Sequence, residues 1–124
     1  MTAIHLDEMR AEMALKKAEA IANLLSMMPP QGQKQIDNTL MRFATLASQM
    51  VEDAKSDDDV RKIADKMADI AMQTQKEEPI ASMLISLVVI FVEAPTLPGS
   101  SAAKAHKIAQ GLLQASFART EEAA

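Results

Sequence analysis

His5, Glu8 and Glu12 form the one stretch of the sequence with side chains suited to binding a metal, because an imidazole and two carboxylates are zinc ligands. Their spacings of three and four residues place them on one side of a helix. The same geometry brings Glu12 next to Lys16, and such a pair is typical of an ordinary solvated helix face. We therefore interpret these residues as a solvated stripe, and the sequence predicts no metal site.

The other reactive side chains lack the partners that catalysis requires. His106 lies between Lys104 and Lys107, with no acidic residue near it in the sequence to activate it as a base. The three aspartates at 57–59 lack the spaced ligands and central glycine of a calcium loop, and their position is typical of helix capping. The sequence contains no cysteine, no phosphate-binding loop and no nucleophilic-serine turn. We expect a protein that is not an enzyme, with no catalytic residue, cofactor or metal.

Composition indicates a small folded protein. The chain has 124 residues, of which 48% are hydrophobic and 24% are charged, and this mixture is able to bury a core. We expect one helical domain over residues 1–124, with the residues after about 119 frayed. The net charge of −4 opposes binding to nucleic acid or anionic lipid. The absence of cysteine, and charged residues near the N-terminus where a secretory signal would be apolar, favour a cytoplasmic location.

The most apolar segment lies between Glu78 and Glu93, which are separated by fourteen uncharged residues. As a helix these residues would reach about 21 Å, which is less than the roughly 30 Å of a bilayer interior. A strand would have no partner within the chain, because no other segment alternates with a period of two. Pro79 suits a first helical turn, and the Pro and Gly residues within 94–99 end a helix. The sequence predicts that Ile80–Val92 is the central helix of a bundle and does not span a membrane.

Four other segments have the periodicity of amphipathic helices. They run over residues 4–28 and 33–54, from Ser56 or Asp57 onward, and from Ser100 or Ser101 onward. The predicted core positions are Ile36, Leu40, Phe43, Ala47, Met50 and Ala54 in the second segment, Val60, Ile63, Ala64, Met67, Ile70 and Ala71 in the third, and Ala105, Ile108, Ala109, Leu112 and Ala115 in the last. Asp37 is placed away from this core. The fold class predicted is therefore all-α, a compact bundle of about five helices.

The first helix carries more apolar surface than a single core contact requires. One line of residues, which includes Ile21, Leu25 and Met28, already supplies a core seam. A second line consists of Leu6, Met9, Met13, Ala20, Leu24 and Met27. Either this long helix packs against two neighbours in its own bundle, or the second line faces another chain, since soluble monomers usually avoid such exposed patches. Methionine fits both alternatives, as core filler and as an adaptable binding residue. We predict partner binding through Leu6, Met9, Met13, Leu24 and Met27.

These patterns predict a non-enzymatic protein-binding module, of the adaptor, chaperone, antiactivator or inhibitor type. Its partner is expected to be another protein, itself as a homodimer, or both. Two alternatives stay open. The second and third helices could form a dimeric helix-turn-helix that binds DNA. The acidic stretch 52–59 between them opposes this alternative, because its carboxylates would be repelled by the DNA phosphates. The other alternative is an enzyme with a carboxylate site that no motif reveals.

Overall fold

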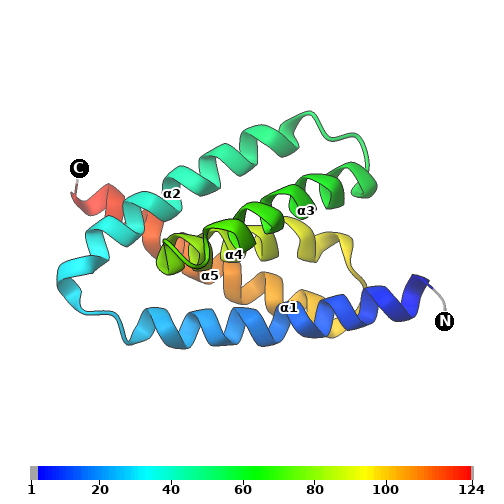
Figure 1. Ribbon diagram of the computed structural model, residues 1–124, viewed down its shortest axis with the longest axis horizontal. Helices are drawn as coiled ribbons and strands as arrows, with labels where there is room; N and C mark the ends of the chain where they lie inside the picture. Colours follow the sequence, from blue (N-terminus) through cyan, green and yellow to red (C-terminus); the bar gives the residue numbers. More distant parts are fainter. Residues whose placement is uncertain (1–2, 124) are drawn as a thin grey trace.

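The protein is a bundle of five α-helices (Figure 1), seen in a computed structural model that describes the backbone of residues 3–123 and the side chains of residues 6–122. The helices are α1 (Ala3–Ser26), α2 (Pro30–Glu52), α3 (Asp57–Thr74), α4 (Pro79–Glu93) and α5 (Gly99–Ala123), and a short 3-10 turn, η1 (Ala94–Thr96), joins α4 to α5. No strand occurs within residues 3–123. The all-α prediction is confirmed.

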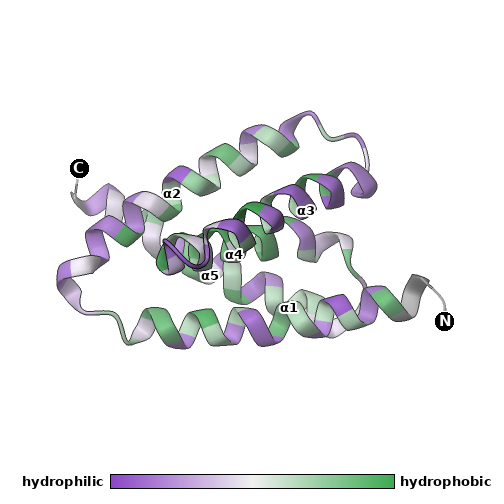
Figure 2. Ribbon diagram, viewed as in Figure 1, coloured by the Kyte–Doolittle hydropathy of each residue, from purple (hydrophilic) through white to green (hydrophobic). Residues whose placement is uncertain are grey.

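Helix α4 forms the centre of the bundle, as the sequence predicted. It packs against all four other helices, and most closely against α3. Leu84, Leu87 and Val88 are almost completely buried, while Ile80, in its first turn, is exposed. Only one residue of this helix, Glu93, is charged, whereas α1 and α2 alternate between purple and green along their length in Figure 2. Burying a leucine side chain contributes about 1.5–3 kcal/mol to folding, so this helix is a large part of the core.

The segment Pro79–Thr96 also meets the length and composition criteria of a membrane span. Its eighteen residues have a mean hydropathy of 1.8, because η1 lengthens the fourteen-residue run that the sequence prediction considered. In the structure, 44% of this segment is buried by the other helices. The central helix of a bundle is apolar on nearly all sides for the same reason that a membrane helix is, so hydropathy alone does not separate the two.

The helix ends follow the local sequence signals. Ser56 caps α3, because its side-chain oxygen accepts a hydrogen bond from the backbone N–H of Asp59 at 3.2 Å. Pro30 and Pro79 occupy the first positions of α2 and α4. Proline is favourable there because a backbone N–H at the first helical position would have no acceptor within the helix. Gly99 begins α5 with a φ of +91°, a conformation that side-chain-bearing residues rarely adopt.

Small residues bring α1 and α5 close together. Ala11 and Ala18 on α1, and Ala105 and Ala109 on α5, are all buried, and these two helices share one of the most extensive contacts in the bundle. The larger Ile21 is the one other fully buried residue of α1 among residues 6–26. The core side of α1 is therefore narrow, and most of its large apolar side chains lie outside the core.

Some predicted core positions are wrong. Met50, Ile70 and Ala115 are exposed, whereas Asp37, placed away from the core by the sequence pattern, is buried. Asp37 lies about 100° around the helix axis from Ile36. Because both residues are buried, the buried face of α2 is rotated toward Asp37, and Met50 lies outside it. On α3 and α5 the exposed residues lie at the edge of the buried sector.

Candidate functional site

A groove of about 720 Å³ runs between α1 and α3, with α4 as its floor. Its volume lies within the range of known ligand sites. The groove is mostly apolar. Its larger apolar lining residues are Met13, Ile21 and Leu24 from α1, Met28 from the connection after α1, Met72 from α3, and Ile80, Met83, Val89 and Ile90 from α4. This groove is more than twice the volume of the hollow between α2 and α4 described below, and it was not predicted from the sequence.

The groove exists because its two walls pack against different neighbours. Helix α1 packs mainly against α5, and α3 packs mainly against α4. Where the walls face each other their side chains are often small, as with Ala14 and Ala20 on α1 and Ala68 on α3. The bundle's own side chains therefore leave the space above α4 open.

The floor of the groove carries the polar stripe of α4. Ser82 is buried, and its hydroxyl donates a hydrogen bond to the backbone carbonyl of Ala71 at 2.5 Å, which joins α4 to α3. Ser86 lies one turn further along the floor and is half-buried. Glu93 ends the stripe at one end of the groove. On an apolar floor, Ser86 is thus a polar group that an occupant of the groove would meet.

The five predicted partner-binding residues are all exposed; four of them lie on α1, and Met27 directly follows it. We call Leu6, Met9, Met13, Leu24 and Met27 the α1 crest; they are between 46% and 72% exposed. Met13 and Leu24 also line the groove, whereas Leu6, Met9 and Met27 lie outside it. Two of the five crest residues therefore also belong to the α1 wall of the groove. Its role in binding a partner stays a prediction.

An ion-pair cluster closes one end of the groove. The Arg10 guanidinium pairs with Glu93 on α4 and, at 3.1 Å, with Asp65 on α3. Burial raises the pKa of the Glu93 carboxyl, although the positive charge of Arg10 opposes this shift. One cation faces two carboxylates here, so the cluster holds one excess negative charge. Lys17, also on the α1 wall, forms no ion pair within the described chain.

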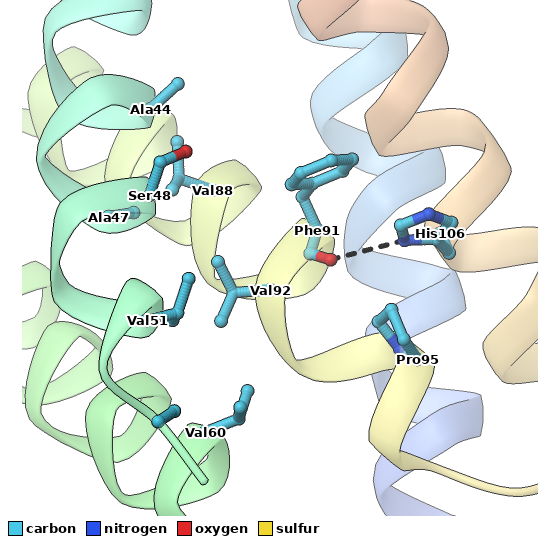
Figure 3. A pocket seen from close by; sticks show the side chains of 11 residues that line it. Ala44, Ala47, Ser48, Val51, Val60, Val88, Phe91, Val92, Pro95 and His106 are labelled. Carbon is cyan, nitrogen blue, oxygen red and sulfur yellow. Dashed lines mark hydrogen bonds between the residues drawn. The ribbon is translucent and has the colours of Figure 1, made fainter. Parts of the chain in front are cut away.

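A second, smaller hollow of about 340 Å³ lies between α2 and α4 (Figure 3). His106 reaches it from α5 and stacks on Phe91, with ring centroids 4.9 Å apart. Nδ1 of His106 lies 3.2 Å from the carbonyl oxygen of Phe91, so this nitrogen carries the proton and donates it. No acidic residue lines this hollow. His106 thus ties α5 to the end of α4, and nothing beside it resembles a catalytic pair.

The stripe of His5, Glu8 and Glu12, which the sequence analysis interpreted as a solvated helix face, is only partly described by the structure. Glu8 and Glu12 are exposed, and the His5 side chain lies outside the described residues. No cluster of three potential metal ligands occurs in the part of the chain that the structure describes. Among the aspartates at 57–59, the Asp59 carboxylate accepts a hydrogen bond from the backbone of Lys55, as expected for a helix start.

The sequence reasoning missed a buried carboxylate on α2. Asp37 accepts hydrogen bonds from Arg119 at 2.7 Å and 2.9 Å, from the Ser116 hydroxyl at 2.6 Å and from Gln33 at 2.9 Å. Burial opposes the charged form, but the hydrogen bonds from Arg119, Ser116 and Gln33 outweigh it and lower the pKa of Asp37. This cluster joins α2 to the last turns of α5. Its signal in the sequence was weak, namely a carboxylate directly after the core residue Ile36.

Comparisons of the chain with known protein families, with characterised proteins and with solved structures find no match. A fold alone does not specify a function, so the geometry and charges of the groove are the basis for assigning one.

Proposed function

We propose that the protein is a non-enzymatic protein-binding module of the adaptor, chaperone, antiactivator or inhibitor type, which holds an α-helix of another protein in the α1–α3 groove. The observation that carries this proposal is the open apolar groove, bordered by the exposed α1 crest. Because α1 and α3 border the groove and α4 forms its floor, a further helix could pack against all three. The binding of an amphipathic helix in an apolar groove is a recurring mode of protein recognition.

The groove fits a helix of about four turns. Arg10 and Leu24 line it near its two ends, and fourteen residues of helix between them correspond to about 21 Å. Met13, Met28, Met72 and Met83 all line this space. Methionine side chains are flexible and polarisable, so they can adapt to the apolar face of an incoming helix.

Charge favours a different protein over a second copy as the occupant. In a symmetric dimer through the α1 crest, two antiparallel α1 helices would cross near the middle of the crest. Lys16 and Lys17 lie there, both exposed, and each would approach the same residues of the other copy. Like charges placed opposite each other weaken an interface. The homodimer expected from the sequence is therefore a distinct outcome of the test below.

Two matched double variants test the proposal. Met13→Glu with Leu24→Glu places carboxylates on the groove side of the α1 crest. Leu46→Glu with Met50→Glu makes the same change at similarly exposed positions on α2, outside the groove lining. Both variants should keep helical circular dichroism and cooperative melting. Affinity capture from a lysate of the source cells should then recover the same proteins with wild type and the α2 variant, and lose them with the α1 variant.

Light scattering on the same samples separates the possible occupants. If wild type is a dimer and the α1 variant alone is a monomer, the occupant is a second copy. If the α1 variant unfolds, the crest is core and the proposed surface is wrong. If the α1 variant retains every captured protein, the interface lies elsewhere on the molecule.

A further inference from the structure

We propose that the helix bound in the groove has two oppositely charged flanks, acidic where it faces Lys17 on α1 and basic where it faces Asp65 on α3. This inference rests on the proposed function, since it specifies the chemistry of the same groove's occupant. It follows from the charges on the two walls, which differ in sign.

The α1 wall offers a positive charge to an occupant. Its two charged lining residues are Arg10 and Lys17. Arg10 is already engaged with two carboxylates at the end of the groove, whereas Lys17 is exposed and forms no ion pair among residues 6–122. Lys16, also exposed, precedes it. A carboxylate on the adjacent flank of a bound helix would therefore find an unpaired ammonium near the middle of the groove.

The α3 wall offers a negative charge. Its one charged lining residue is Asp65, whose side chain remains 63% exposed although it contacts Arg10. Glu93, from the floor, shares the same guanidinium and leaves the cluster with an excess negative charge. Asp69, one turn further along α3, is exposed as well. A lysine or arginine on this flank of the occupant would meet carboxylates at the side opposite to Lys17.

The remaining contacts of the occupant are apolar. Beyond Lys17 the groove is bordered by Leu24, Met28, Met72 and Ile80, and no charged residue lines that end. The occupant should therefore be a helix of about four turns with apolar residues at positions i, i+3 or i+4 and i+7, and with its charges on the flanks.

Three synthetic peptides test this inference. They share one length, of about sixteen residues, and the same leucine face, which covers the groove length at about 1.5 Å per residue. The first carries glutamates on one flank and lysines on the other, the second carries lysines on both flanks, and the third carries glutamates on both. Fluorescence anisotropy at low salt should show the first peptide binding at least about tenfold more tightly than either of the others, with the difference shrinking as salt screens the charges.

Charge reversal at one wall provides the internal check. In Lys17→Glu both walls are acidic, so the peptide with lysines on both flanks should become the tightest binder. Lys104→Glu makes the same change in net charge on α5, at an exposed residue outside the groove lining, and should leave the order of the peptides unchanged. If Lys17→Glu and Lys104→Glu behave alike, the pairing with Lys17 is wrong.

The outcomes separate this inference from the proposed function. If the three peptides bind wild type equally, and Met13→Glu with Leu24→Glu abolishes that binding, the groove binds helices and the charge preference is refuted. If none of the peptides binds wild type, the proposed function fails together with the inference. If a wild-type dimer must dissociate before any peptide binds, the occupant is a second copy and the proposed charge pattern is refuted.

Discussion

Truncating the buried carboxylate of Asp37 should destabilise the fold strongly, because three side chains depend on it. In Asp37→Ala, Arg119, Ser116 and Gln33 each lose an acceptor. Ser116 is buried, so its hydroxyl has no direct access to water as a replacement. Arg119 is nearly half exposed and can be rehydrated, which reduces its share of the loss.

The magnitude follows from these environments. A buried polar group left without a partner costs about 1–3 kcal/mol, and a hydrogen bond to a charged group contributes about 1.5–3 kcal/mol before the rehydration of Arg119 is considered. We expect Asp37→Ala to lower the free energy of unfolding by about 3 kcal/mol, a large fraction of the 5–15 kcal/mol that is typical of a domain. Asn38→Ala, a truncation at the exposed neighbouring residue, should change the stability by less than about 0.5 kcal/mol.

The effect should also depend on pH. The pKa of Asp37 is lower in the folded protein than in the unfolded chain, so the unfolded chain takes up its proton first as the pH falls. The stabilisation is present above the ordinary carboxyl pKa of about 3.9 and is lost below it. Urea unfolding of wild type and Asp37→Ala at several pH values measures the difference between their free energies of unfolding. This difference should become smaller in acid. Equal stability of wild type and Asp37→Ala at neutral pH would refute this account of the cluster.

Three further predictions concern the core, the metal question and the membrane. Leu87→Asp buries an unpaired charge and should abolish cooperative folding, whereas Ile80→Asp, exposed on the same helix, should melt cooperatively; a cooperatively folded Leu87→Asp protein would contradict the central position of α4. Zinc should leave the melting temperature unchanged, and a stoichiometric rise that His5→Ala abolishes would reveal a metal site. Lipid vesicles should not sediment the protein, because α4 packs against all four other helices; co-sedimentation would mean that this helix enters lipid.

The sequence was sufficient to predict the helices, because their ends have local causes. Ser56, Pro79 and the Pro and Gly residues of 94–99 act within one turn of the chain, and the apolar run of α4 requires burial wherever it lies. The exposed crest of α1 was also one of the two alternatives that its wide apolar arc allowed. The structure leaves Met13 and Leu24 exposed, as that alternative requires.

The groove and the buried carboxylate of Asp37 could not be predicted from the sequence, because both depend on contacts between distant parts of the chain. Asp37 and Arg119 are 82 residues apart, and their pairing depends on how α2 and α5 cross. The groove depends on α1 packing against α5 while α3 packs against α4, which no periodicity reveals. The pairing of Glu93 with Arg10, which lies 83 residues before it, likewise depends on how α1 packs against α4.

Methyl NMR of the methionines tests the central claim most directly, because the chain carries its own probes. Met13, Met28, Met72 and Met83 line the groove, and Met50 lies on α2 outside the groove lining. Addition of the peptide with oppositely charged flanks should shift the methyl resonances of the four groove methionines and leave that of Met50 unchanged. Shifts centred on Met50, or no shift at any methionine at saturating peptide, would contradict a helix-binding groove between α1 and α3.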